Sequence, residues 1–403
     1  MSTNGMVNKR KKTLAFHTLG CKVNTYETNA MIQKFIEAGY TIEDFDNKSS
    51  IYIVNTCTVT SIADRKSRQY LRKAKQNNKN AIVVAVGCYV ESAKAEIENI
   101  SEIDLVIGNN DKANIVQLVE EYMATLPNSS LSGMTGDGEI CCPSSEEETY
   151  LTVGANSYDR ALKYTKSPIA YQDFGSITYN PNTRTNIKIQ DGCDNFCTYC
   201  IIPYVRGRIR SRLRKNIIDE IKELTKKEKR EIVITGINIS NYEKEINNEN
   251  GLIELLEEIN KIEGLKSIRL SSLSPTILTE EFILRLAKLD KISPHFHLSL
   301  QSACDETLKR MNRKYNVTLL EKNINNLKQA FPNSYLATDI IVGFPGETDE
   351  EFTQTYEFLK KIKFNKLHVF PYSKRKGTIA ANMKNQVENE IKKQRSKMLM
   401  FIL

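Results

Sequence analysis

The sequence contains no tryptophan, only four histidines, and few glycines and prolines (18 and 10 in 403 residues). These low counts exclude a collagen-like or low-complexity chain. With 40% apolar and 26% charged residues, the composition indicates a folded chain rather than a largely disordered one. The longest apolar run, near residues 81–86, is far shorter than the roughly 18 residues that span a bilayer. Residues 1–12 are polar and basic, and no apolar segment follows them, which argues against a secretory signal. We expect a cytoplasmic protein with no membrane partner.

The charge and the cysteine count narrow the class of protein further. A net charge of +8 permits a polyanionic partner without requiring one. Nine cysteines are an odd number, and in a reducing cytosol such thiols indicate metal binding or catalysis rather than disulfides.

Short apolar runs alternate with helical patterns, which is typical of an α/β protein with parallel sheets. Residues 1–12 form a basic tail, and 13–126 are predicted to form a doubly wound domain with strands at 13–19, 51–54, 81–86 and 104–107. Residues 127–185 are expected to be a linker or insertion, because turn-forming residues dominate there.

A second series of strands and helices covers residues 186–380. Its six strands suggest a partial (β/α)6 barrel that is open on one side to a large substrate. Residues 381–403 are expected to be a C-terminal helix. The six predicted strands are 187–190, 231–235, 267–271, 296–300, 336–342 and 367–370.

The sharpest motif is the C-x3-C-x2-C run formed by Cys193, Cys197 and Cys200, directly after the first barrel strand. Three thiolates at this spacing can hold three irons of a [4Fe–4S] cluster and leave the fourth iron free for another ligand. A structural zinc site is the alternative, but it normally needs four ligands, and the sequence nearby offers no fourth cysteine or histidine. We therefore assign these cysteines to a catalytic iron–sulfur cluster.

With its flanks 189–193 and 201–208, this motif resembles the radical S-adenosylmethionine superfamily and, within it, the methylthiotransferase branch. The resemblance implies that the open iron binds S-adenosylmethionine and that electron transfer from the cluster generates a radical.

Three further cysteines, Cys21, Cys57 and Cys88, each come just after a predicted strand of the first domain. The carboxyl ends of parallel strands meet at one edge of a sheet, so these thiols could converge. Buried, unreactive cysteines are the alternative; we favour a second [4Fe–4S] cluster. The resemblance implies that this cluster carries or delivers sulfur.

Further candidates for cofactor binding follow the second, fourth and fifth barrel strands, at the edge where such barrels place their chemistry. Glycine at a strand end more often marks a turn, so the motifs gain weight only by recurring. The resemblance places the methionine amino group of S-adenosylmethionine near the motif that follows the second barrel strand. The candidates are Thr235, Gly236, Asn238, Gln301, Ser302, Ile341 and Gly343.

Five arginines alternate along one segment: Arg206, Arg208, Arg210, Arg212 and Arg214. In an extended chain this spacing places them on one face, where they could follow the phosphate backbone of an RNA. The alternative is a solvated basic face. Arg65, Lys66 and Arg68 could extend the same surface.

Segments 16–24, 55–60, 63–68 and 367–375 are most similar to tRNA threonylcarbamoyladenosine methylthiotransferases of the MtaB type. That resemblance implies methylthiolation of N6-threonylcarbamoyladenosine at position 37, in the tRNA anticodon loop. It also implies two [4Fe–4S] clusters, S-adenosylmethionine, a flavodoxin- or ferredoxin-like electron donor and a sulfur source. The alternatives are an isopentenyladenosine-type enzyme and a non-catalytic iron–sulfur RNA-binding protein. Family members normally continue into a TRAM domain, so we expect a chain truncated before it.

Overall fold

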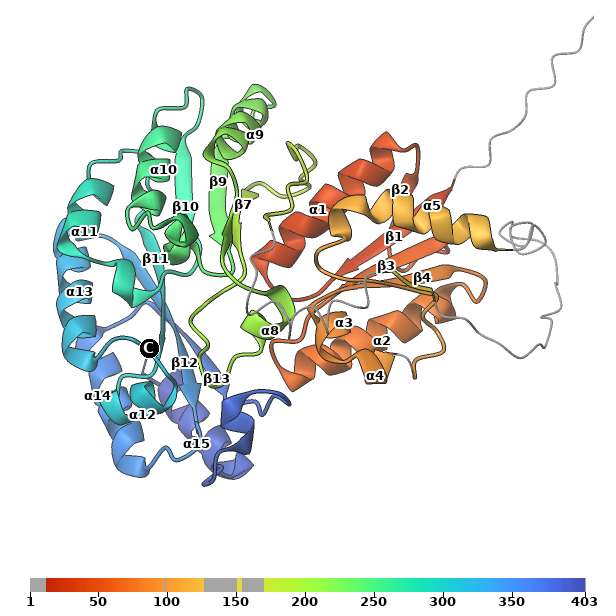
Figure 1. Cartoon of the computed structure of the whole chain (residues 1–403). Helices are drawn as coiled ribbons and strands as arrows, with labels where there is room; N and C mark the ends of the chain where they lie inside the picture. Colours follow the sequence, from red (N-terminus) through yellow and green to blue (C-terminus); the bar gives the residue numbers. More distant parts are fainter. Residues whose placement is uncertain (1–11, 98, 127–150, 154–169, 403) are drawn as a thin grey trace, which may run out of the picture. The chain divides into compact units, whose positions relative to one another are not determined.

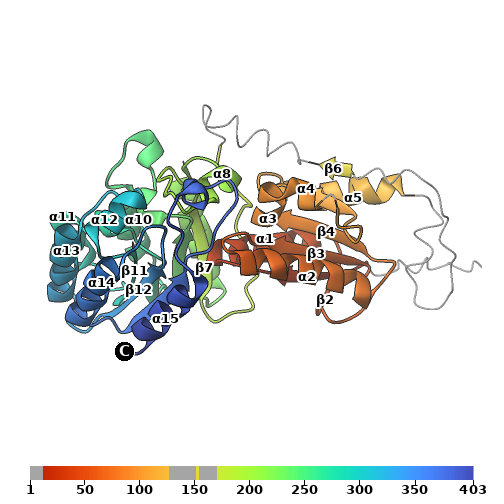
Figure 2. The same ribbon diagram turned by 90° about the horizontal axis from the view of Figure 1, so that it is seen from below.

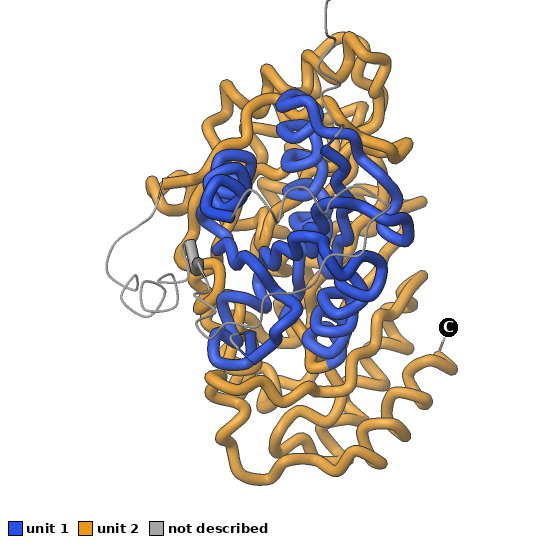
Figure 3. The backbone as a smooth tube through the Cα atoms, turned by 90° about the vertical axis from the view of Figure 1, so that its right-hand side faces the viewer, with its two compact units in different colours: residues 1–58, 62–158 blue, residues 59–61, 159–403 orange. Residues whose placement is uncertain are grey.

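The computed structural model describes residues 12–97, 99–126, 151–153 and 170–402. It divides into two compact units, one of residues 1–58 and 62–158 and one of residues 59–61 and 159–403 (Figure 3). Most of the expected basic tail and of the 127–185 linker lies outside the described residues. The domain limits expected from the sequence therefore stay predictions. Among the described residues, no helix is both long and apolar enough to cross a membrane.

The first unit is built on a six-stranded sheet in the order β2-β1-β3-β4-β5-β6, with every neighbouring pair parallel. All residues of β3 and β4 are buried, as expected for central strands covered on both faces. The strands are β1 (Thr13–Thr18), β2 (Thr41–Glu43), β3 (Ile51–Thr56), β4 (Ile82–Gly87), β5 (Leu105–Ile107) and β6 (Leu151–Val153).

Helices cover both faces of this sheet, which confirms the doubly wound prediction. Helices α1 (Lys22–Glu37) and α5 (Ile115–Thr125) lie on one face (Figure 1). On the other face lie α2 (Ser61–Asn77), α3 (Cys88–Ser92) and α4 (Lys94–Ile97). There Leu71 of α2 and Ile97 of α4 share a core with Tyr52 and Val54 of β3.

The second unit contains the predicted partial barrel of six parallel strands. A short antiparallel strand, β8 (Arg210–Ser211), is added at the β7 edge. Isolated bridges from Ile268 to Ile292 and from Leu273 to Leu298 join the sheet of β7, β9 and β10 to that of β11, β12 and β13. The six strands are β7 (Thr185–Asp191), β9 (Glu231–Gly236), β10 (Ser267–Leu270), β11 (His295–Gln301), β12 (Tyr335–Val342) and β13 (Lys366–Pro371).

Helices cover the outside of the barrel in both views (Figures 1 and 2). They are α9 (Arg214–Lys226), α10 (Gly251–Asn260), α11 (Glu280–Leu286), α13 (Val317–Ala330) and α14 (Asp349–Ile362). Shorter or terminal helices are α8 (Ile202–Arg206), α12 (Asp305–Arg310) and α15 (Asn389–Met400).

Side chains along the barrel strands alternate between the apolar core and the inner face of the barrel. In β11, Phe296, Leu298 and Leu300 are completely buried in the core shared with the helices. Successive side chains of a strand point to opposite faces, so His297 and Gln301 lie on the inner face of the arc. The inner face therefore carries the polar side chains from which a site can be built.

Candidate functional site

The loop between β7 and α8 carries Cys193, Cys197 and Cys200. Cys197 is buried and the other two are partly buried. Burial raises the pKa of Cys193 to about 11 and that of Cys200 to about 12. Because metal ligation deprotonates cysteine, bound iron would keep these side chains as thiolates despite their raised pKa. The chemistry of these side chains therefore fits an iron–sulfur cluster.

The start of this loop depends on a close backbone approach. Gly192 has φ +71°, and a Cβ there would lie 1.9 Å from the carbonyl oxygen of Arg208. The Cys193 N–H donates to the carbonyl oxygen of Gly207 at 3.0 Å. Only glycine accepts this conformation and this contact without strain, so the position of Cys193 is set by the backbone before it.

The middle of the loop is fastened to the segment that follows α12. Asn312 Nδ2 donates to the carbonyl oxygen of Phe196 at 3.1 Å, and the Thr198 hydroxyl donates to that of Arg310 at 2.8 Å. The Thr198 N–H donates to the carbonyl oxygen of Met311 at 3.1 Å. These contacts hold the cysteine loop over the barrel.

Arg313 makes a direct contact with a triad sulfur, which the sequence did not reveal. Its Nη1 lies 3.5 Å from Cys197 Sγ. Its Nε donates to the Tyr315 hydroxyl and its Nη2 to the carbonyl oxygen of Ser299, both at 2.7 Å. Hydrogen bonds to cluster sulfurs tune the reduction potential of a cluster, so this guanidinium is placed to influence any cluster bound there.

A cavity of about 260 Å³ in the second unit brings together two of the predicted cofactor residues, Gln301 and Ile341. Tyr199, between the second and third cysteines of the triad, also lines it, so the cavity borders the cysteine loop. The full lining is Val59, Thr60, Tyr199, Gln301, Asp339, Ile341, Phe370, Pro371, Tyr372 and Ser373.

Gly236 and Asn238 are joined to the cysteine loop through Gln190. The Asn238 N–H donates to Gln190 Oε1 at 2.9 Å, and a Cβ on Gly236 would lie 3.0 Å from the same oxygen. Gln190 Nε2 in turn donates to the carbonyl oxygens of Asp191 and Gly192, at 2.7 and 2.6 Å. Thr235 itself is buried. Gln190 thus couples the end of β9 to the residue before Cys193.

Ser302 and Gly343 are engaged with the helices instead. Ser302 Oγ accepts from the Cys304 N–H at 3.3 Å and lies 3.3 Å from Thr355 Oγ1 of α14. The Gly343 N–H donates to Glu347 Oε2 at 2.6 Å, and a Cβ there would meet Lys392 Cγ of α15 at 2.3 Å. Cofactor contacts from these two residues stay predictions.

A cluster of two histidines and a carboxylate on the inner face of β11, β12 and β13 was also missed. His297 Nε2 lies 2.9 Å from Asp339 Oδ1, and the His297 and His368 rings stack with centroids 5.1 Å apart. Burial and the neighbouring His297 lower the pKa of His368. Asp339 also lines the cavity. The period-two alternation of these strands is the signal that could have found the cluster.

In the first unit, the three other cysteines follow neighbouring strands. Cys21 is exposed at the start of α1, whereas Cys57 and Cys88 are buried beyond β3 and β4. Gly20 has φ +99°, and a Cβ there would lie 2.7 Å from Cys57 Sγ. At Gly87, with φ +103°, a Cβ would lie 2.5 Å from the carbonyl oxygen of Thr56. The backbone beside Cys21 and Cys88 therefore packs against the end of β3. Such packing is needed if the three thiols are to converge, which stays a prediction.

A buried polar network, which the local sequence patterns do not indicate, supports the ends of β1 and β3. Asn24 Nδ2 donates to the carbonyl oxygens of Leu19 and Thr56, at 2.8 and 2.9 Å. Lys112 Nζ, completely buried, donates to Glu27 Oε2 at 2.6 Å and to Asn55 Oδ1 at 3.1 Å. The network fixes the loops that carry Cys21 and Cys57.

In the part of the chain that the structure describes, no group of three His, Cys, Asp or Glu side chains is arranged to hold one metal ion. In a [4Fe–4S] cluster each thiolate binds a different iron, so the geometry of a single-ion site is not required. The fit of both triads rests on their cysteines, their strand-end positions and their rigid loops.

The arginine segment is not an exposed track. Arg206 Nη1 donates to both carboxylate oxygens of Asp191 at 3.1 Å, and Arg210 Nη2 lies 3.5 Å from the same carboxylate. Arg212, only 1% exposed, is bound by Glu220 and by Asp173, the latter at 2.8 Å.

The prediction of one exposed face is therefore wrong for Arg206, Arg210 and Arg212, because buried carboxylates pair with them. Arg214 pairs with three glutamates of the same unit. Arg208 keeps 42% of its side chain exposed beside Asp194. RNA contacts from Arg208 and Arg214 stay predictions.

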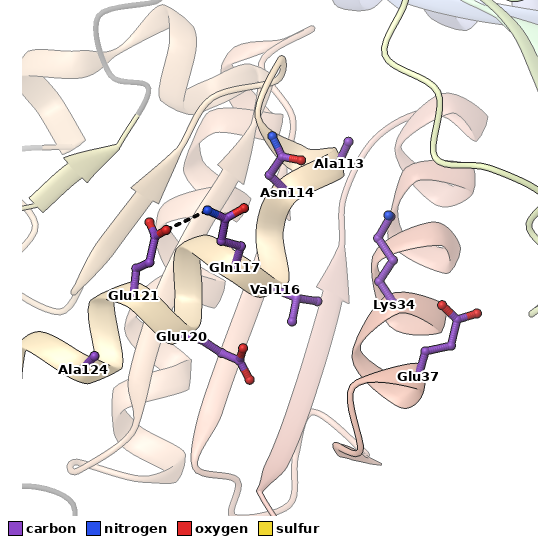
Figure 4. Close-up of a pocket in the computed structure, with 9 residues that line it drawn as sticks. All are labelled: Lys34, Glu37, Ala113, Asn114, Val116, Gln117, Glu120, Glu121 and Ala124. Carbon is purple, nitrogen blue, oxygen red and sulfur yellow. Dashed lines mark hydrogen bonds between the residues drawn. The ribbon is translucent and has the colours of Figure 1, made fainter.

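A groove of about 650 Å³ between α1 and α5 of the first unit contains none of the predicted site residues (Figure 4). Glu37 of α1 and Glu120 and Glu121 of α5 make its lining acidic, with Lys34 beside Glu37 on α1. Gln117 donates to Glu121 at 2.7 Å. The groove offers neither thiols nor a convergent set of ligands, so we do not assign it to the site.

Comparison with known proteins decides the family. Residues 187–359 match the model of the radical SAM superfamily, and residues 13–108 match the uncharacterized protein family UPF0004. The chain is 40% identical to the threonylcarbamoyladenosine tRNA methylthiotransferase MtaB of Bacillus subtilis, over 95% of this chain and 78% of the relative. The chain belongs to the radical SAM methylthiotransferase family.

Other members of the methylthiotransferase family and more distant radical SAM enzymes are also similar. The tRNA-2-methylthio-N(6)-dimethylallyladenosine synthase of Clostridium tetani is 34% identical over 98% of this chain and 81% of the relative. The radical S-adenosylmethionine methyltransferase TsrM of Kitasatospora setae has a TM-score of 0.62, covering 92% of this chain and 75% of TsrM. At 15% identity, TsrM supports the fold alone.

Proposed function

We propose that this methylthiotransferase converts N6-threonylcarbamoyladenosine at position 37 of tRNA to its 2-methylthio derivative, using S-adenosylmethionine and two [4Fe–4S] clusters. The observation that carries the proposal is the rigid loop of Cys193, Cys197 and Cys200 beside a cavity lined by Tyr199 and Gln301. The substrate follows the MtaB relative, at 40% identity, rather than the dimethylallyladenosine synthase at 34%.

Each triad would hold one cluster. Bound clusters supply the electron that cleaves S-adenosylmethionine and the sulfur that enters the product. The chain's part is to fix the two sets of thiols and the substrates in position. Gln190 and Arg313 hold the barrel loop and contact its backbone and sulfur, whereas Asn24 orients the loops of the first unit.

The cavity suits the adenosyl part of S-adenosylmethionine. Tyr199, Phe370 and Tyr372 provide flat apolar surface, and Gln301 and Asp339 provide hydrogen-bonding groups that would orient a bound ligand. Such a mixture of aromatic walls and few polar groups is typical of nucleoside-binding cavities.

Three further assignments complete the proposal. We expect a flavodoxin- or ferredoxin-like protein to deliver the electron, because reductive cleavage needs a donor of low potential. A separate source must replace the sulfur consumed in each turnover. The protein is expected in the cytoplasm, where its tRNA substrate is found.

The proposal is tested by cysteine substitutions in the anaerobically reconstituted protein. Cys193→Ala should lose about half the iron and all release of 5′-deoxyadenosine. Cys57→Ala should lose a similar share of iron and all 2-methylthio product, but still release 5′-deoxyadenosine. Iron analysis and mass spectrometry of nucleosides from tRNA carrying threonylcarbamoyladenosine provide the readouts.

Cys304→Ala is the matched control, because Cys304 is a buried cysteine outside both triads. It should keep full iron and full product. Full iron and product in the Cys57→Ala variant would refute the second cluster. Methylthiolation of tRNA that carries isopentenyladenosine, but not of tRNA that carries threonylcarbamoyladenosine, would refute the proposed substrate.

A further inference from the structure

Helix α2 carries a dense run of cations that the site does not use. It contains Arg65, Lys66, Arg68, Arg72, Lys73 and Lys75 but a single acidic residue, Asp64. Arg65, Gln69, Arg72 and Gln76 are all exposed and follow one another at intervals of four, three and four. This spacing places them in one stripe along the helix.

The stripe borders a shallow hollow of about 640 Å³ whose lining comes entirely from α2. The lining offers only hydrogen-bond donors of positive charge and amide groups, with no carboxylate among them. Donors of this kind select a ligand that is anionic and rich in acceptor oxygens, as phosphates are. The lining residues are Arg65, Arg68, Gln69, Arg72, Lys73, Gln76 and Asn77.

Four of the six cations of α2 pair with carboxylates, which leaves two for another partner. Within the described residues, Arg65 and Lys66 form no ion pair. Arg72 lies 3.8 Å from Glu102, and 55% of its side chain is exposed. Exposed pairs of this kind contribute little to stability and are screened by salt. A phosphate can therefore replace the carboxylate partner of Arg72 at low cost.

The opposite face of α2 anchors the helix. Leu71 and Ala74 are completely buried in the core of the first unit, so these apolar residues of α2 are not available to insert into a membrane.

We infer that the exposed stripe of α2, with Arg65 and Arg72 as its charges and the exposed Lys66 beside it, binds the phosphate backbone of the RNA substrate. This inference rests on the proposed function, because the tRNA is the polyanion that the cavity's chemistry would bring to the protein. Cations and amides on a rigid helix bind backbone without reading sequence.

The test is the triple variant Arg65→Gln, Lys66→Gln, Arg72→Gln, with tRNA affinity measured by fluorescence anisotropy over a range of salt concentrations. Removing three phosphate contacts should lower the slope of log K against log salt by about 2–3, since each contributes about 0.7–0.9. Affinity at low salt should fall at least tenfold. Thermal unfolding of the variant checks that the fold is retained.

The matched control is Lys222→Gln, Lys226→Gln, Lys227→Gln, which removes the same charge from exposed positions in and just after α9. It should keep the wild-type slope. An equal loss in the control would reduce the effect to net charge and overturn the inference, as would an unchanged slope in the α2 variant.

Two remaining outcomes separate this inference from the proposed function. If the wild-type protein bound no tRNA, the RNA substrate itself would be refuted, and the inference with it. If the wild-type protein bound tRNA and the α2 variant lost only binding to phosphatidylserine vesicles, the proposed function would stand and α2 would be a membrane-facing surface.

Discussion

Two basic segments, residues 206–215 and helix α2, are both rich in cations in the sequence but differ in how deeply the structure buries them. Arg206 and Arg212 are buried against carboxylates, whereas Arg65 and Lys66 are exposed. The difference lies in what each segment packs against. In α2 an apolar stripe with Leu71 enters the core and directs the cations outward, whereas residues 206–212 have acidic neighbours on several elements.

This contrast shows that arginines at every second position do not by themselves define an exposed surface. A buried cation needs a partner, since an unpaired one is too costly to keep. For Arg212 the partners, Asp173 and Glu220, lie 39 and 8 residues away. A run of cations whose partners are distant in the sequence is easily mistaken for an exposed face.

The largest effect expected from this comparison is the loss of stability in Arg212→Met. Removing this guanidinium leaves Glu220 buried without its cation, and breaking a buried pair costs about 3–5 kcal/mol. Arg72→Met on α2 is the matched control and should cost at most about 1 kcal/mol. Urea unfolding of both variants makes the measurement, and equal losses would erase the distinction between the two segments.

A smaller effect is expected from acid. Burial would raise the pKa of Asp173, but hydrogen bonds from Arg212 and Asn216 outweigh it and hold the pKa below its usual 3.8. The folded state therefore binds this proton less readily than the unfolded state. Its stabilisation is full well above pH 3.8 and is lost as the pH falls through the lowered pKa.

Urea midpoints measured between pH 6 and pH 3 check this sign. Asp173→Asn should be less stable at pH 6 and should lose less stability on acidification than the wild type. A parallel loss in both proteins would show that other carboxylates control the acid response.

The smallest effect concerns Arg208, whose side chain is the most exposed of the five arginines in residues 206–214. Arg208→Ala should change stability little, because its pair with Asp194 at 3.4 Å is open to solvent. If Arg208 contacts one phosphate, the salt slope of tRNA binding should fall by about 0.7–0.9. Anisotropy titrations provide the slope, and no change would place Arg208 among the solvated cations.

Much of the fold was predictable because parallel strands buried on both faces leave apolar runs such as 82–87. Four of the six strands in the first sheet follow from such runs, and the six barrel strands follow from short runs between helical patterns. β2, β6 and β8 have only three, three and two residues, and strands this short leave a weak pattern. Positions of Cys21, Cys57 and Cys88 at strand ends followed directly from the strand predictions.

The contacts that shape the site were not predictable, because they join residues distant in the sequence. Arg313 reaches a sulfur 116 residues away, and Gln190 joins β7 to Asn238, 48 residues on. Only the paired strands and the closing loops bring them together. Local patterns identify which cysteines carry the chemistry but not which neighbours tune them.

Helix α15 limits how far the chain can be shortened from its C-terminal end without loss of contacts in the second unit. The Lys392 stem fills the space beside Gly343 and its ammonium lies 5.4 Å from the ring centre of Tyr372, a cavity residue. Arg395 Nη1 donates to the buried Glu347 carboxylate at 2.6 Å. Proteolysis before residue 389 would remove both cations at once. A fragment that keeps these contacts must therefore include α15 as well as the last barrel strand.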